Sequence, residues 1–224
     1  MMRLLQAVRD CFTKSGDQGV GELAAHRTSD DQGQRAPLTQ HLYVKEDSIY
    51  LRCWSGERVH ILNPQLHEIR IDDIAHGLAH TCRFGGQTPF FYSVAQHSVL
   101  VADMVDPKLQ LWGLLHDASE AYLNDITRPL KRTLPGYAAI ETKMMSAICE
   151  KFGLPLEMPV EVKRADNQMI AAEFRDLFGD APEDYLNWSD GFFAARTRVL
   201  PCSPDVAKHQ FLLRFEDLMA RRAA

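Results

Sequence analysis

A histidine and three acidic residues lie within a stretch whose apolar residues recur at helical spacing. The stretch is LLHDASEAYLNDI, residues 114–126, and its ionisable members are His116, Asp117, Glu120 and Asp125. The apolar residues in and beside it predict a buried helix over about 108–123; they are Leu111, Leu114, Leu115, Ala118 and Tyr122. Burial of an unpaired charge is costly. We therefore expect this segment to bind something that compensates its ionisable groups.

The rest of the chain predicts mainly helices. An alternating segment over 48–62 with Ser55-Gly56 at its centre predicts a β-hairpin. Helical patterns follow from about residue 70, with Asp72 or Asp73 as one N-cap, Ser93 as another, and Gly153 as a helix end. Further helices are expected over 92–105, 136–153, 158–178 and from Ser203-Pro204 to about 221.

These patterns predict an all-α fold of five or six helices with a small N-terminal β-hairpin. Residues 1–40 are expected to be a flexible segment, with a short helix over 3–13 and a loop over 14–38 rich in Gly, Asp, Gln, Ser and Thr. The domain is expected to span 41–224, with the hairpin at 48–62 and the helical core at 71–222.

Composition excludes several classes of protein. The chain has 224 residues, 46% of them hydrophobic, which is enough for one domain with a substantial core. Its net charge of −5 argues against a stable nucleic-acid partner. Five scattered cysteines without a CxxC motif indicate free thiols. Without a signal peptide or an apolar run of about 18 residues, the chain is expected to be cytoplasmic and to have no membrane partner.

Three predicted helices can bring the ionisable residues together. Glu120 follows His116 by four positions and Asp117 by three, so these residues share one helix face. His97 lies on the apolar stripe of the preceding helix, and Asp166 lies among apolar residues of a later one. Each has an ordinary explanation, because His97 could be a core histidine and Asp166 could pair with Lys163 or Arg164. Together, imidazole and carboxylate groups suit a divalent metal ion.

The segments YSVAQHSVLVA, LLHDASEAYLNDITRPLK and VKRAD resemble the HD-domain metal-dependent phosphohydrolases. The resemblance covers roughly residues 71–178 and is strongest to the branch with bacterial 5′-deoxynucleotidases of the YfbR type and related phage deoxynucleotide hydrolases. It implies an HD-domain helical bundle and one divalent metal ion (Mn, Co, Mg, Fe, Ni or Zn). The ligands that it implies are His97, His116, Asp117 and Asp166.

The same resemblance implies further roles. Glu120 matches the catalytic acidic residue, and Asp125 matches a further acid of the site. Arg83 stands where the family places an arginine for the phosphate, and Phe84 stands where the deoxynucleotidase carries tryptophan near the sugar. A homodimer is suggested by the resemblance alone.

The expected activity is metal-dependent phosphohydrolysis of nucleotides, with (deoxy)nucleoside 5′-monophosphates as the first candidate substrates. Arg83 can hold phosphate oxygens in a fork, or it can be a surface residue paired with Asp72 or Asp73. Lys131 is either a second phosphate contact or a solvated loop lysine. Thr127 can bond to the substrate or begin a turn.

Four alternatives remain open at this point. A deoxynucleoside triphosphate triphosphohydrolase could use the same ligands, and a non-catalytic nucleotide-binding regulator could retain them. A di-iron oxygenase would need more histidines, and residues 118–165 contain none. His76 and His80 in HGLAH have zinc-helix spacing, and Cys82 is near, but the glutamate of HExxH is missing.

Overall fold

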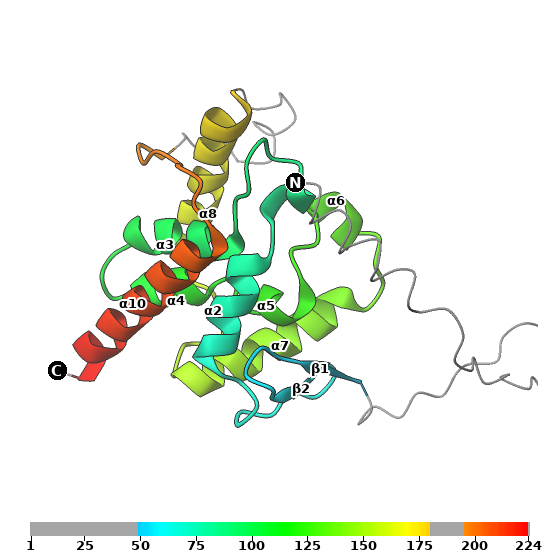
Figure 1. The fold of residues 1–224 in the computed structure, drawn as a ribbon. Helices are drawn as coiled ribbons and strands as arrows, with labels where there is room; N and C mark the ends of the chain where they lie inside the picture. The colour runs from blue at the N-terminus through cyan, green and yellow to red at the C-terminus, as the bar shows by residue number, and fades with distance from the viewer. Residues whose placement is uncertain (1–48, 180–194, 224) are drawn as a thin grey trace, which may run out of the picture. The chain divides into compact units, whose positions relative to one another are not determined.

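A short hairpin precedes a succession of helices, as the sequence predicts (Figure 1). The computed structural model describes residues 49–179 and 195–223. The strands are β1 (Tyr50–Arg52) and β2 (Arg58–His60). The helices are α2 (Ile71–His80), α3 (Val94–Asp103), α4 (Gln110–Leu115), α5 (Glu120–Leu123), α6 (Arg128–Lys131), α7 (Tyr137–Phe152), α8 (Val160–Glu173) and α10 (Pro204–Ala223), with single turns η2 (Arg83–Gly86) and η3 (Phe174–Phe178).

The all-α class with a small hairpin is therefore confirmed. The described residues all belong to one compact unit, Tyr43–Ala224. The helix predicted over 3–13 and the loop predicted over 14–38 lie outside the described residues.

The hairpin is attached to α2 through Asp73, which corrects one prediction. Arg70, and neither Asp72 nor Asp73, occupies the N-cap position of α2. The carboxylate of Asp73 accepts hydrogen bonds from the backbone N–H of Ser55 at 2.8 Å and from its hydroxyl at 2.6 Å. These donors come from the hairpin turn, so Asp73 serves a tertiary contact instead of its own helix end.

The other predicted helix ends are present. The hydroxyl of Ser93 accepts a hydrogen bond from the backbone N–H of Gln96 and caps α3. Gly153 ends α7 in the left-handed conformation, with φ of 64°, which glycine adopts without steric cost. The Ser203 hydroxyl accepts from the backbone N–H of Val206 at the start of α10.

Two large apolar clusters form most of the core, and α3 contributes to both. The first joins residues of α2, α3, α4, α7 and α10, with Val59 of the hairpin packed against them. The second joins α3 to α8 and includes Val101, Trp112 and Met169. Side chains on α3 therefore lie where the bundle around α10 meets α8. The candidate site lies at this junction.

The helix predicted over 108–123 is interrupted. Between α4 and α5, the backbone N–H of Ala118 bonds to Leu115 O at 3.0 Å, and that of Glu120 bonds to Asp117 O at 2.9 Å. These are bonds to the third preceding residue, so the chain tightens at residues 116–119. His116 and Asp117 therefore lie on a tightened turn and Glu120 begins α5, so the three residues do not share one regular helix face.

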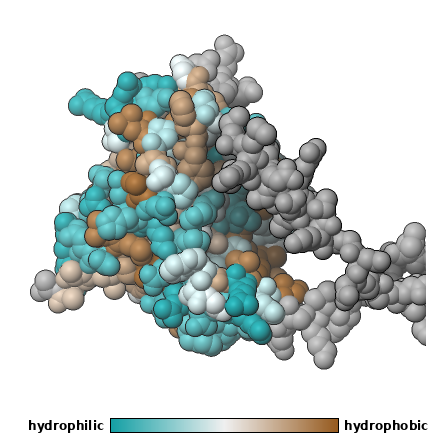
Figure 2. All heavy atoms as spheres, in the orientation of Figure 1, coloured by the Kyte–Doolittle hydropathy of each residue, from teal (hydrophilic) through white to brown (hydrophobic). Residues whose placement is uncertain are grey.

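The surface is mixed in character. On the face shown in Figure 2, hydrophilic side chains are interspersed with hydrophobic ones, as is usual for protein surfaces. No helix among the described residues combines the length and the apolar character needed to cross a membrane. Cys53, Cys82, Cys149 and Cys202 are free thiols.

Candidate metal centre

Three buried side chains from different helices converge on one point. His97 comes from α3, His116 follows the last residue of α4, and Asp166 comes from α8. One ligand atom from each lies within 4.8 Å of the others. The Nε2 atoms of His97 and His116 lie 3.3 Å and 4.0 Å from Oδ1 of Asp166. This cluster could bind a metal ion.

Both imidazole rings are oriented by a hydrogen bond at the opposite nitrogen. Nδ1 of His97 lies 2.6 Å from Oε1 of Glu173, and Nδ1 of His116 lies 2.7 Å from the carbonyl oxygen of Gly113. Both partners accept hydrogen bonds, so each Nδ1 carries the proton. The two Nε2 atoms are buried and have no hydrogen-bond partner. Paired buried Nε2 atoms beside a carboxylate fit a metal ion.

Asp117 borders this group from the turn after α4. Its Oδ2 lies 3.1 Å from Nε2 of His116 and 3.8 Å from Nε2 of His97. Burial raises the pKa of this carboxyl, but the two histidines outweigh burial and hold its pKa below the usual range. Asp117 is therefore close enough to complete the ligand set that the sequence predicts.

The charges at the centre favour binding of a cation. Burial raises the pKa of Asp166, yet the nearby histidines and Lys163 lower it well below the usual range. Burial and Arg83 lower the pKa of His97, while Glu173 and Asp166 raise it to about 9. A metal ion bound here would displace the proton that His97 otherwise holds, because metal ligands must be deprotonated.

A glycine allows α3 and α4 to approach closely. A Cβ atom on Gly113 would lie 2.9 Å from Cα of Ala102, closer than real Cβ contacts. Gly113 lies on α4 and Ala102 on α3. The absence of a side chain at 113 thus brings together the two helices that carry His97 and lead to His116.

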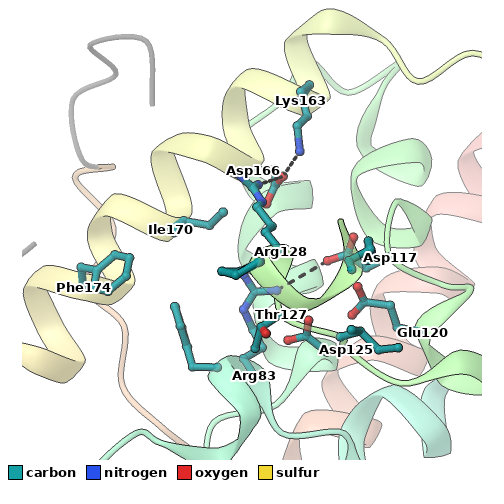
Figure 3. Close-up of a pocket in the computed structure, with 14 residues that line it drawn as sticks. Arg83, Asp117, Glu120, Asp125, Thr127, Arg128, Lys163, Asp166, Ile170 and Phe174 are labelled. Carbon is teal, nitrogen blue, oxygen red and sulfur yellow. Dashed lines mark hydrogen bonds and ion pairs between the residues drawn. The ribbon is translucent and has the colours of Figure 1, made fainter. Parts of the chain in front are cut away.

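A pocket opens beside the histidine–aspartate cluster. Figure 3 shows Asp117, Glu120 and Asp125 on one side of it, with Ile170 from α8 and Phe174 from η3 opposite. The remaining residues that line it include Arg83, Phe84, Ile126, Thr127, Arg128, Pro129, Lys131, Lys163 and Asp166. The pocket therefore has ionisable side chains on one side and apolar side chains on the other.

Glu120 and Asp125 have environments suited to proton transfer. Burial raises the pKa of Glu120 well above its usual range, and Asp117 and Asp125 raise it further. Oε2 of Glu120 is buried and has no hydrogen-bond partner. Burial also raises the pKa of Asp125. A raised pKa means that each carboxyl group holds a proton more readily than an ordinary one, a property that general acid–base groups share.

Arg83 is buried, which overturns the alternative of a surface arginine paired with Asp72 or Asp73. Its Nη2 lies 3.2 Å from Oε2 of Glu173, and its Nη1 lies 3.5 Å from Oδ2 of Asp117. Its Nε is buried and has no hydrogen-bond partner. The guanidinium group thus contacts Asp117, which borders the candidate metal cluster, and Arg83 lines the pocket, where Figure 3 shows it below Asp117.

Two residues beside the pocket have an unusual backbone. Phe84 has φ of 54° and Asn124 has φ of 64°, and no other non-glycine residue in the described ranges has positive φ. Phe84 follows Arg83, and its ring makes edge contacts with Phe174 and Phe178 at 5.4 and 5.3 Å between centroids. Asn124 precedes Asp125. The adjacent residues Arg83 and Asp125 both line the pocket.

The cations that line the pocket include Arg128, to which the sequence analysis gave no role. Lys131 lines the pocket from α6, but its Nζ is paired with Glu141 at 2.6 Å, so it is not a free loop lysine. Arg128 and Lys163 lie 3.7 Å and 2.6 Å from Oδ2 of Asp166. The predicted pairing of Asp166 with Lys163 is thus present, and it leaves Oδ1 facing the histidines. Thr127 lines the pocket just before α6.

Glu173 is the site residue that sequence reasoning missed. It is fully buried, with contacts to His97 and Arg83 and with the hydroxyl of Tyr92 at 2.8 Å. One signal was available, because Glu173 is an acid in the apolar run MIAAEF. It also follows Asp166 by seven positions, which places both on one helix face.

The second histidine pair forms a ring stack and no metal group. The rings of His76 and His80 lie 4.1 Å apart, and His76 also stacks on Trp54 at 5.2 Å. Nδ1 of His80 bonds to the carbonyl oxygen of His76. In the described ranges, His97, His116 and Asp166 form the one group with metal-binding geometry. The zinc alternative at HGLAH is therefore not supported.

Comparison with known proteins identifies relatives of the chain. No family model matches it. The chain is 40% identical over 124 residues to an uncharacterized protein of Rhodobacter capsulatus, covering 51% of this chain and 63% of that protein. It is 41% identical over 176 residues to the uncharacterized protein YfdR of Escherichia coli K12, covering 77% of this chain and 97% of YfdR. At that identity and coverage, the chain belongs to the family of YfdR.

Proposed function

We propose that this protein is a metal-dependent phosphohydrolase that removes phosphate from nucleotides, with (deoxy)nucleoside 5′-monophosphates as its first candidate substrates. The observation that carries the proposal is the pair of buried Nε2 atoms of His97 and His116, which face Asp166 without hydrogen-bond partners. They lie beside a pocket with a buried arginine and a buried acid that has a raised pKa. This combination suits hydrolysis of a phosphate ester.

The residues that would hold the ion are His97, His116, Asp117 and Asp166. A divalent ion bound there supplies positive charge toward phosphoryl oxygens and lowers the pKa of coordinated water. Arg83 has donors in a planar fork that can bind the phosphate oxygens. Glu120 can take a proton from the attacking water, and Asp125 can orient that water or pass the proton on.

The apolar wall suits the nucleoside part of the substrate. Ile170 and Phe174 face the acidic side across the pocket, and Phe84 also lines it. Aromatic faces bind bases through stacking and bury the apolar edge of a sugar. Thr127 lies between the two walls and offers a hydroxyl for a polar contact. The pocket therefore has one side for a phosphate and another for a nucleoside.

A second candidate is hydrolysis of deoxynucleoside triphosphates to release triphosphate. The observation that favours it is the pair of cationic side chains Arg128 and Lys163, which line the pocket beyond Asp166. Their charges could bind phosphates farther from the cleaved bond. A non-catalytic nucleotide-binding regulator is the third candidate, and the buried acid Glu120 argues against it.

One assay separates these candidates. The protein is stripped with a chelator, reloaded with Mn²⁺, Co²⁺ or Mg²⁺, and incubated with dNMPs, NMPs and dNTPs. The products are resolved as phosphate, pyrophosphate and triphosphate. Metal-dependent release of phosphate from monophosphates supports the first proposal, and triphosphate release from dNTPs supports the second. Nucleotide binding without any product would overturn both.

A further inference from the structure

The carboxylate of Glu173 binds two groups that have different tasks in the proposed site. Its Oε1 accepts hydrogen bonds from Nδ1 of His97 at 2.6 Å and from the hydroxyl of Tyr92 at 2.8 Å. Its Oε2 accepts from Nη2 of Arg83 at 3.2 Å. One carboxylate therefore contacts a candidate metal ligand through one oxygen and the candidate phosphate-binding arginine through the other.

Tyr92 completes a closed set of contacts around Arg83. The backbone N–H of Arg83 donates to the carbonyl oxygen of Tyr92 at 3.0 Å, and the Tyr92 side chain donates to Glu173. Arg83 is thus held at its backbone and at its guanidinium group by partners that also contact each other. All three residues are buried, which limits the alternative positions open to them.

We propose that Glu173 is a positioning residue that fixes the His97 ring for metal binding and the Arg83 guanidinium for phosphate binding. The proposal rests on the proposed function for its phosphate part, and its metal part stands apart from turnover. Carboxylates that accept from the non-coordinating nitrogen of a histidine ligand fix its ring orientation and tautomer. The additional contact with Arg83 extends the effect of the same carboxylate to the pocket.

A glutamine at this position cannot replace both contacts. Its side chain has one acceptor oxygen and one donor NH₂ group, whereas His97 and Arg83 both present donors. If the oxygen faces His97, the NH₂ group faces Arg83, and the reverse orientation loses the His97 contact. Glu173→Gln therefore tests the two tasks together at nearly constant volume.

The chain offers a matched control in Glu68. This residue is also a buried glutamate whose carboxylate contacts a histidine, with Oε1 lying 2.5 Å from Nδ1 of His60. It lies next to the hairpin and not in the pocket. Glu68→Gln therefore repeats the same chemical change at a carboxylate–histidine pair outside the site.

The experiment measures the Mn²⁺ affinity of the wild type, Glu173→Gln and Glu68→Gln by titration calorimetry, together with thermal unfolding and KM for the best nucleotide. We expect Glu173→Gln to weaken Mn²⁺ binding by about 10–100-fold. We expect KM to rise about tenfold, the equivalent of one hydrogen bond to a charged group. Glu68→Gln should change the melting temperature alone.

Several outcomes would overturn the proposal. Folded Glu173→Gln with wild-type Mn²⁺ affinity would do so, as would an equal loss of affinity in Glu68→Gln. If Glu173→Gln does not fold, Glu173→Asp provides the same test, because it keeps the charge but withdraws it from His97 by one methylene. Wild-type Mn²⁺ affinity in folded Glu173→Asp would then reject the proposal. The calorimetric measurement needs no substrate, so it gives an answer even where no nucleotide is hydrolysed.

Discussion

Among the described residues, Glu68 and Glu173 are buried glutamates that each contact Nδ1 of a histidine, and the two histidines differ in the surroundings of the second nitrogen. At the hairpin, Glu68 accepts from His60 and from the backbone N–H groups of His60 and Gln65. The His60 side chain is 32% exposed, so its other nitrogen can reach water. At the pocket, the His97 side chain is 0% exposed, and its Nε2 lacks a hydrogen-bond partner.

Because the two histidines differ in whether the second nitrogen can reach water, a carboxylate–histidine pair is not by itself a sign of metal binding. The hairpin pair satisfies its own polar groups and connects β2 to the segment before α2. The pocket pair leaves one buried nitrogen unsatisfied, and a second histidine and an aspartate face it. A buried polar atom without a partner carries a cost of about 1–3 kcal/mol. A ligand at that point removes this cost, and the hairpin pair has no such requirement.

The largest difference in metal binding is expected between removal of a pocket histidine and removal of the hairpin histidine. His116→Ala should lose bound metal, with affinity falling at least 100-fold, because loss of an outer partner alone costs about 10–100-fold. Hydrolysis should fall with it, while His60→Ala should retain both properties. Metal content is measured by elemental analysis after gel filtration. Stoichiometric metal in His116→Ala would remove the distinction between the two pairs.

Next in size is the effect of Glu120. Glu120→Gln should retain the metal, since the proposed ligands are unchanged, while kcat falls about 10²–10⁴-fold through loss of the proton acceptor. The kinetics and the Mn²⁺ affinity are measured on one preparation, with Glu150→Gln, an exposed acid of α7 outside the pocket lining, as a control. If the metal is lost together with activity, Glu120 is a ligand and the proposed roles are wrong.

Arg83→Ala is expected to have a smaller effect on catalysis and an additional effect on stability. Loss of a charged hydrogen bond to phosphate costs about 1.5–3 kcal/mol, or roughly 10–100-fold in kcat/KM. Because Arg83 is buried beside Glu173, its removal also leaves a buried carboxylate without its cation, and the melting temperature should fall. Arg58→Ala, a substitution next to the hairpin pair, should change neither kcat/KM nor the melting temperature. Unchanged kinetics in Arg83→Ala would leave Lys131 as the candidate phosphate contact.

The smallest expected effect is on the pH dependence of stability at the hairpin pair. Burial raises the pKa of Glu68, but hydrogen bonds from His60 and Gln65 outweigh it and lower the pKa below the ordinary value. A lowered folded-state pKa stabilises the fold above the unfolded-state pKa of about 4.3 and loses that effect as pH falls below it. Glu68→Gln should thus be about 1–2 kcal/mol less stable at pH 7. The difference should shrink as the pH falls below the unfolded-state pKa in denaturant titrations, and a constant difference would contradict this prediction.

The sequence was sufficient for most of the elements and for the ligand candidates, although the short helix α6 was not predicted. His97, His116 and Asp166 each stood out as ionisable residues within apolar helical runs, and the structure places these three together. The hairpin and the ends at Ser93 and Gly153 depend on local turn and cap chemistry, which neighbouring residues determine. Such features can be read without knowledge of tertiary contacts.

The features that were missed depend on distant partners or small differences in helix geometry. Glu173 lies 90 residues after Arg83, so no local pattern indicates that they form a pair. Asp73 bonds to a turn 18 residues before it, and this contact replaces the predicted cap. The tightened turn after α4 replaces α-helical hydrogen bonds with 3₁₀-type bonds over four residues. Over so short a length, the α-helix and the 3₁₀-helix have nearly the same spacing of apolar residues.

The positive φ angles of Phe84 and Asn124 have a consequence for attempts to make this protein more heat-resistant. A non-glycine residue in such a conformation costs about 1–3 kcal/mol, which neighbouring contacts must offset. Relief of this strain by glycine substitution would be an obvious route to stabilisation. Each residue adjoins a pocket side chain, so a more flexible backbone there would also loosen Arg83 or Asp125. Selection for heat resistance and selection for turnover would therefore favour different residues at positions 84 and 124.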